Sequence, residues 1–188
     1  MIFSRLTTIA ILTALATSGC VDRTPVPAST QADSAAASAA ATTSTASGEL
    51  LELMMGTGES DAFPLATGSF VTGSLNLPKA GKVSAFAIQI GNYANTADGN
   101  VSIELCQHGR CSSGQQSLAG SKDNEYLEIA MERPLDVGTD SPLTYRFTKL
   151  DGGNQVALWL YEPTEVLSAM KINDQTAVER APKIALRF

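Results

Sequence analysis

Hydrophobic and polar residues alternate with a period of two along most of the chain after residue 49. Five segments show the pattern clearly, at 84–90, 101–105, 126–131, 156–161 and 183–188. In the second of these, Val101, Ile103 and Leu105 share one side. Because successive side chains of a strand point to opposite faces of its sheet, the pattern predicts half-buried β-strands.

Three further segments favour strands, namely 68–77, 143–150 and the residues after Cys111. Turn sequences rich in Gly, Pro, Asn and Asp separate the segments, at 78–82, 95–100, 119–124, 138–142 and 151–154. About eight short strands with no long helix predict an all-β fold, most simply an antiparallel, jelly-roll-like β-sandwich. Only 51–56 and 163–174 are compatible with a short helical turn.

The start of the chain has a different pattern. Arg5 is followed by the apolar run Leu6–Ala16 and then by small residues up to Cys20. This order is typical of a secretory signal, and the apolar run is too short to span a bilayer. The four residues "TSGC" resemble a bacterial lipobox, which implies a signal peptide over 1–19 and lipidation of Cys20, palmitate included. The alternative is an ordinary secretory signal in which the cysteine is incidental.

The resemblance to lipoproteins also bears on location. Val21 stands where Asp would favour retention at the inner membrane, so we expect the outer membrane, with its periplasmic or surface face left open. Residues 20–48 are almost entirely Ala, Ser and Thr after the cysteine, which predicts a disordered tether. The remaining segment, 49–188, is long enough for one domain with a real core.

Charge narrows the choice of partners. The chain has 13 Lys and Arg against 19 Asp and Glu, a net charge of −6, and no run of basic residues. Nucleic acid and direct contact with anionic headgroups are therefore not expected as partners. The predicted contact with the membrane is through the lipid anchor.

Cys106 and Cys111 flank the only histidine, His108. In an oxidising compartment such a pair favours a disulfide across the mouth of a hairpin loop at 107–110, where Gly109 can adopt a positive φ. A zinc site normally needs four ligands in two spaced pairs, and only three candidates lie here, so no metal is predicted. Two unpaired thiols are the remaining alternative.

Catalytic motifs are hard to find. The chain has no nucleophile elbow, no phosphate loop and no HExxH motif, and a histidine-based triad could form only at His108. No pair of carboxylates has a spacing that singles it out for glycoside hydrolysis. The sequence therefore predicts a protein that is not an enzyme and has no cofactor, with a glycan hydrolase as the less favoured reading.

Aromatic residues suggest a binding face. Trp159 and Tyr161 alternate with Leu158 and Leu160, so they share the opposite side of one strand. The candidate ligand-binding residues are Trp159, Tyr161, Tyr126 and Glu128. The three aromatic rings could stack on sugars, and Glu128 could join the same patch. The alternative is that these rings pack under a loop or form the core. The Asx residues of two loops could serve calcium but are more often plain turns: Asp98, Asn100, Asp123 and Asn124.

Several motifs occur in a recognisable order: "GNYANTADGNVSIEL" (91–105), "KDNEYLEI" (122–129), "LTYRF" (143–147) and "NQVALWLY" (154–161). Over 69–161 the chain resembles a β-sandwich accessory domain of bacterial cell-surface proteins that is often attached to polysaccharide glycosyltransferases. The resemblance implies a non-catalytic domain that binds or organises surface polysaccharide. A protein-interaction or structural module of the envelope is the alternative.

Overall fold

The computed structural model describes residues 48–53, 56, 58–175 and 177–188. The signal peptide at 1–19, the lipidation of Cys20 and the tether up to residue 47 lie outside the described residues. Within the described ranges there is no helix, and thus none long and apolar enough to cross a membrane.

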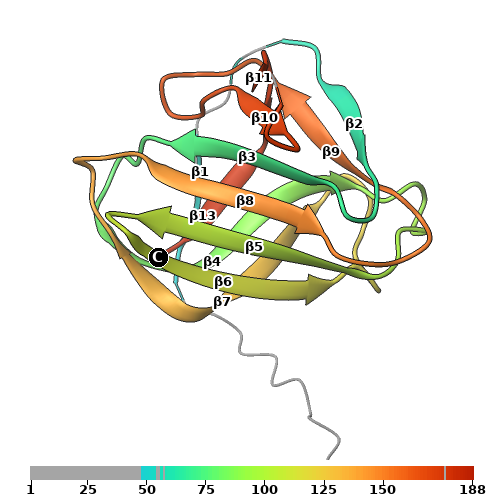
Figure 1. Ribbon diagram of the computed structural model, residues 1–188, viewed down its shortest axis with the longest axis horizontal. Coiled ribbons are helices and arrows are strands. Elements are labelled where there is room, and N and C mark those ends of the chain that lie inside the picture. The colour runs from blue at the N-terminus through green and yellow to red at the C-terminus, as the bar shows by residue number, and fades with distance from the viewer. Residues whose placement is uncertain (1–47, 54–55, 57, 176) are drawn as a thin grey trace, which may run out of the picture. The chain divides into compact units, whose positions relative to one another are not determined.

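Thirteen strands in this part of the chain form two antiparallel sheets (Figure 1). The seven-stranded sheet contains β1 (Leu50–Glu52), β2 (Asp61–Leu65), β4 (Gly81–Gly91), β7 (Tyr126–Val137), β9 (Val156–Tyr161), β12 (Ala181–Pro182) and β13 (Ile184–Arg187). The six-stranded sheet contains β3 (Phe70–Leu75), β5 (Asn100–Gln107), β6 (Arg110–Ser117), β8 (Leu143–Lys149), β10 (Met170–Ile172) and β11 (Ala177–Val178). The predicted antiparallel β-sandwich is confirmed.

The strand order is that of a jelly roll. Neighbours follow the order β2-β9-β4-β7 in one sheet and β3-β8-β5-β6 in the other. From β2 to β9 the chain changes sheet at every connection except the β5–β6 hairpin, which is how a jelly roll winds. The prediction of about eight strands holds for this central unit, and five short strands add to it: β1, β10, β11, β12 and β13.

The end of the chain enters the middle of the seven-stranded sheet. Strand β13 pairs with β4 on one side and with β1 on the other. Just before it, Lys183 accepts a hydrogen bond from Gln89 on β4 and donates one to Trp159 on β9. The segment β12–β13 therefore separates β4 from β9 where these two strands diverge.

The core lies between the two sheets and is built from the inward residues of the alternating pattern. Phe86 of β4 and Tyr145 of β8 meet across it, with ring centroids 5.9 Å apart. Ile88, Ile103 and Leu158 are also buried. The two segments compatible with a helical turn instead contain the short strands β1 and β10.

Candidate functional site

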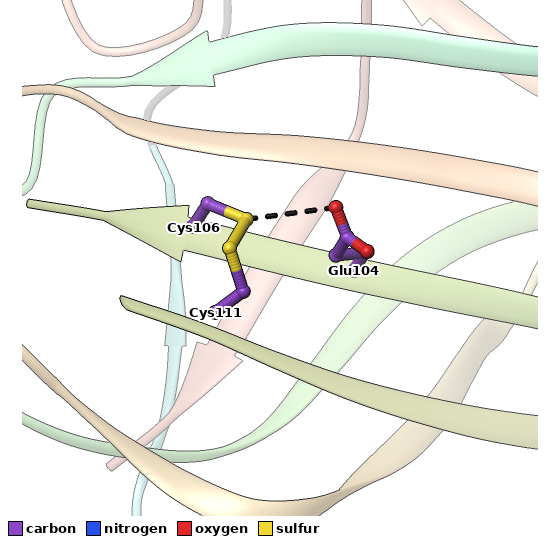
Figure 2. A group of neighbouring side chains, drawn as sticks. All are labelled: Glu104, Cys106 and Cys111. Atoms are coloured by element: carbon purple, nitrogen blue, oxygen red, sulfur yellow. Dashed lines mark hydrogen bonds between the residues drawn. A yellow bond between two sulfur atoms is a disulfide. The ribbon is translucent and has the colours of Figure 1, made fainter. Parts of the chain in front are cut away.

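Two of the three cysteines, Cys106 and Cys111, form a disulfide that faces away from the core (Figure 2). Cys106 and Cys111 stand opposite each other on β5 and β6, with an S–S distance of 2.04 Å. The loop is tighter than predicted, because Gln107 still pairs with Arg110 and only two residues make the turn. Both have positive φ, 51° at His108 and 72° at Gly109, as a type I′ hairpin turn requires.

Glu104 lies beside the disulfide, and its Oε1 is 3.5 Å from the Sγ of Cys106 (Figure 2). A sulfur in a disulfide has no proton to donate and no thiolate charge, so this contact is neither a hydrogen bond nor a ligand arrangement for a metal. The Glu104, Cys106 and Cys111 group therefore has the residue types of a metal site without its chemistry.

His108 has neighbours that resemble those of a catalytic triad. The Oγ of Ser141 is 2.7 Å from His108 Nε2, and the Oδ1 of Asp140 is 3.4 Å from the same nitrogen. A triad needs its serine and its acid on different ring nitrogens, because the acid orients the ring through Nδ1. This arrangement instead fixes the hairpin tip to the loop after β7, together with the buried Gln107, which bonds to Gly138.

A lysine occupies the centre of the first Asx-rich loop. Lys149 is fully buried, and its Nζ donates to the backbone oxygens of Asp98 and Asp151 at 2.8 and 2.6 Å. The backbone N–H of Asn154 donates to Asp98 Oδ1, which together with the nearby Lys149 charge lowers the pKa of Asp98. Asn100 donates to Asp151 in the same way. The oxygens that could have served calcium are thus bound by donors of the protein itself.

The second Asx-rich loop has a structural partner as well. Asp123 Oδ1 accepts the backbone N–H of Asn92 at 2.6 Å. Asn92 is buried and opens a turn in which Tyr93, Ala94 and Asn95 all have positive φ. Side-chain bonds from Asn92 to Ser121 and from the Asn95 backbone to Asn92 hold this unusual turn in place.

The predicted aromatic residues meet on the outer face of the seven-stranded sheet. The hydroxyl of Tyr161 donates to Gln89 Oε1 at 3.0 Å, and Gln89 is the cross-strand partner of Tyr126. Lys183 Nζ lies 5.5 Å from the centre of the Tyr126 ring. All three aromatic side chains, including Trp159, are half-buried. Burial raises the pKa of Tyr126, and the charge of Glu52 adds to the effect.

Side chains of the protein close much of this face. Glu128, a predicted ligand-binding residue, forms a two-pronged salt bridge with Arg187, with both N–O distances at 2.7 Å. Beneath these larger side chains, Ala85, Ala87 and Ala185 point outward and are still fully buried. Much of this face is therefore occupied by contacts within the protein.

An open groove of about 420 Å³ crosses the outer face of the other sheet. We call it the outer groove. Its polar lining residues are Thr72, Ser74, Glu104, Thr144, Arg146, Ser168 and Lys171. They come from β3, β5, β8 and β10 and from the segment before β10, and Figure 1 shows these strands side by side in the sheet nearer the viewer.

Sequence reasoning did not find the outer groove. Its residues are the polar positions of ordinary alternating strands, and such positions normally face water. Only the pairing of β10 with β3 and of β3 with β8 brings them together. The signal in the sequence was limited to Thr, Ser and Arg in the outward phase of 70–75 and 143–149.

Comparison of the chain with protein-family models, with curated proteins and with solved structures found no match. The resemblance over 69–161 thus stays a prediction from its motifs.

Proposed function

We propose that this protein is a lipid-anchored, non-catalytic protein of the bacterial cell envelope, whose jelly-roll domain binds polysaccharide chains in the outer groove. The single observation that carries the proposal is the set of polar side chains that line this groove on the outer face of the six-stranded sheet. Sugars present many hydroxyls that both donate and accept hydrogen bonds. Arg146 and Lys171 supply donors, Glu104 supplies an acceptor, and the Ser and Thr hydroxyls supply both.

The size of the groove also supports a ligand. Sites for small ligands usually measure roughly 300–1,000 Å³, and the outer groove lies within this range. The aromatic face is the weaker candidate, because Tyr161 is bonded to Gln89 and Glu128 to Arg187. We therefore propose the outer groove, on the sheet opposite to Trp159 and Tyr161, as the binding site.

Absence of catalysis is part of the same proposal. His108 carries both of its polar neighbours on one nitrogen, which does not suit acyl transfer. Incubation with envelope polysaccharide should release no shorter products. Release that depends on Glu104 or Glu132, which line a small cavity of about 80 Å³ beside the disulfide, would contradict a pure binding role.

The test of binding is a glycan array probed with the purified protein in detergent. We expect a signal for the unmodified protein, loss of signal for the paired substitutions Glu104→Gln and Arg146→Gln, and a retained signal for Trp159→Ala combined with Tyr161→Ala. Circular dichroism of each variant checks that the fold is intact. An array with no signal for the unmodified protein, or one on which only the aromatic variant loses it, would contradict the proposed site.

The lipid anchor is tested separately in cells. When cells grow with labelled palmitate, the protein should carry the label. It should also be found in the outer-membrane fraction, because several acyl chains together give stable anchoring. Cys20→Ser should remove the label and release the protein from the membrane. Unlabelled wild-type protein would identify the first residues as an ordinary secretory signal.

A further inference from the structure

Four charged or polar side chains of the outer groove lie in one row across four neighbouring strands. Lys171 of β10 is the partner of Thr72 on β3, Thr72 is the partner of Arg146 on β8, and Arg146 is the partner of Glu104 on β5. We call these four residues the charged row. Because neighbouring strands lie about 4.8 Å apart, the row spans roughly 14 Å.

A second row runs beside it and contains hydroxyls. Ser74 of β3 is the partner of Thr144 on β8, and Thr144 is the partner of Cys106 on β5. Ser168, just before β10, continues this row through its hydrogen bonds with Ser74. A chain lying in the groove would thus have charges along one side and neutral hydroxyls along the other.

The two cations of the charged row, Arg146 and Lys171, have N–H groups that are available for a ligand. The guanidinium of Arg146 lies 3.4 Å from the centre of the Phe70 ring, and its nearest carboxylate, that of Asp174, is 3.8 Å away. Packing on the ring holds the guanidinium while its N–H edges remain available. Lys171 Nζ makes no hydrogen bond or ion pair with the described residues.

Charge is distributed unevenly along the row. Lys171 and Arg146 flank Thr72, whereas Glu104 stands at the opposite end, and no salt bridge within 4.0 Å joins Glu104 to Arg146 among the described residues. The groove therefore offers two cations where one negative group would be bound and a carboxylate where a hydroxyl would be bound. A second negative group beside Glu104 would be repelled.

From this geometry we infer that the outer groove selects saccharide chains in which a carboxylate-bearing sugar is followed by a neutral one. Arg146 binds the sugar carboxylate through two parallel hydrogen bonds, and Lys171 adds a second cation. Glu104 accepts hydroxyls of the neutral neighbour. The inference rests on the proposed function, since it assigns the class of polysaccharide to the same groove.

Three sets of oligosaccharides of equal length test this inference on the full protein in detergent: a neutral glucan, a homopolymer of galacturonate, and an alternating polymer of glucuronate and N-acetylglucosamine. Calorimetry should rank the alternating polymer first, and added salt should weaken its binding.

Three variants test the roles of the charged residues. Arg146→Gln should reduce the affinity for the alternating polymer roughly tenfold to a hundredfold. Glu104→Gln should narrow the gap between the homopolymer and the alternating polymer. Lys122→Gln, on an exposed loop, is the matched control and should change neither.

The outcomes separate the two proposals. Equal binding of neutral and acidic chains, with Arg146→Gln harmless, would overturn the inference and leave saccharide binding in place. No binding of any of the three sets would overturn the proposed function itself. Competition by polyglutamate as strong as that by the acidic sugar would show that the groove recognises an acidic peptide, and would also overturn the inference.

Discussion

Lys149 shows how much one side chain can contribute to this fold. Its ammonium is fully buried and donates to the backbone oxygens of Asp98 and Asp151, which belong to two different loops. Lys149→Met keeps most of the length of the side chain but leaves both oxygens without this donor. We expect the free energy of unfolding to fall by about 3 kcal/mol, measured by urea denaturation.

The control for this substitution is Lys122→Met. Lys122 is well exposed and, within the part of the chain that the structure describes, pairs only with Glu125 at 3.5 Å, so we expect a change below about 0.5 kcal/mol. If adding calcium stabilised the wild-type protein, the loop oxygens would be a metal site, contrary to our interpretation.

Tyr145 presents the opposite case, a buried group without a partner. Its hydroxyl makes no hydrogen bond within the described residues, and Gly73 leaves the space that the ring fills. Tyr145→Phe should therefore raise the free energy of unfolding by up to about 1 kcal/mol, while Tyr161→Phe, which loses the bond to Gln89, should lower it by about 1 kcal/mol. A loss of stability in Tyr145→Phe would contradict this view.

The same burial predicts a pH dependence. Burial raises the pKa of Tyr145 above its usual value of 10.0, so the folded protein keeps this proton where the unfolded chain loses it. The contribution to stability is complete below that value and is lost as the pH rises above it. Urea denaturation at about pH 8 and about pH 11 should show a smaller drop for Tyr145→Phe than for the wild-type protein. Equal drops would contradict the prediction.

At the scale of elements, the β5–β6 hairpin combines a tight turn with a disulfide next to it. The closed ring is small, so replacing Cys106 and Cys111 by serine should lower the free energy of unfolding by about 2 kcal/mol. Intact-mass analysis before and after reduction should differ by two hydrogens. Two thiols that react with iodoacetamide in the native protein would contradict the bridge.

The longer strands were predictable because their pattern is simple. Strand β9, for instance, occupies the same residues, 156–161, as the predicted segment. Strand β2 was missed, since Pro64 interrupts a short segment and a proline normally counts against a strand. In the structure β2 lies at the edge of its sheet, where the missing N–H is tolerated.

Side-chain partners were much harder to predict than strands. Alternation correctly separates Trp159 from Leu158, but it does not show that Gln89 or Arg187 would engage the aromatic face. The charged row depends on four strands from distant parts of the chain, and its register appears only after pairing. The alternating pattern shows on which face of its sheet a residue lies, whereas a binding site depends on which strands become neighbours.

At the scale of the whole molecule, both ends of the domain belong to one sheet. Deleting 184–188 removes β13, whose Ile184 and Leu186 are fully buried between β4 and β1. We expect this truncated chain to stay unfolded, as judged by circular dichroism and proteolysis. A chain that starts at residue 42, a few residues before β1, should keep the unfolding midpoint of the full chain.

The two truncations test which end segments the folded domain needs. A folded protein without β13 would show that the jelly roll closes on its own. A lowered midpoint in the chain that starts at residue 42 would show that earlier residues contribute to stability.

The central place of β13 also matters while the protein is being made. Ribosomes release the strands in chain order, so β4 can pair with β7 and β9 first but cannot pair with β13 until Ile184–Arg187 have been added. During synthesis the domain thus lacks the strand that joins β1 to the rest of its sheet, and long-range β pairing is slow in any case. The seven-stranded sheet therefore gains its full set of pairings only when β13 is present, and until then β1 has no neighbour in this sheet.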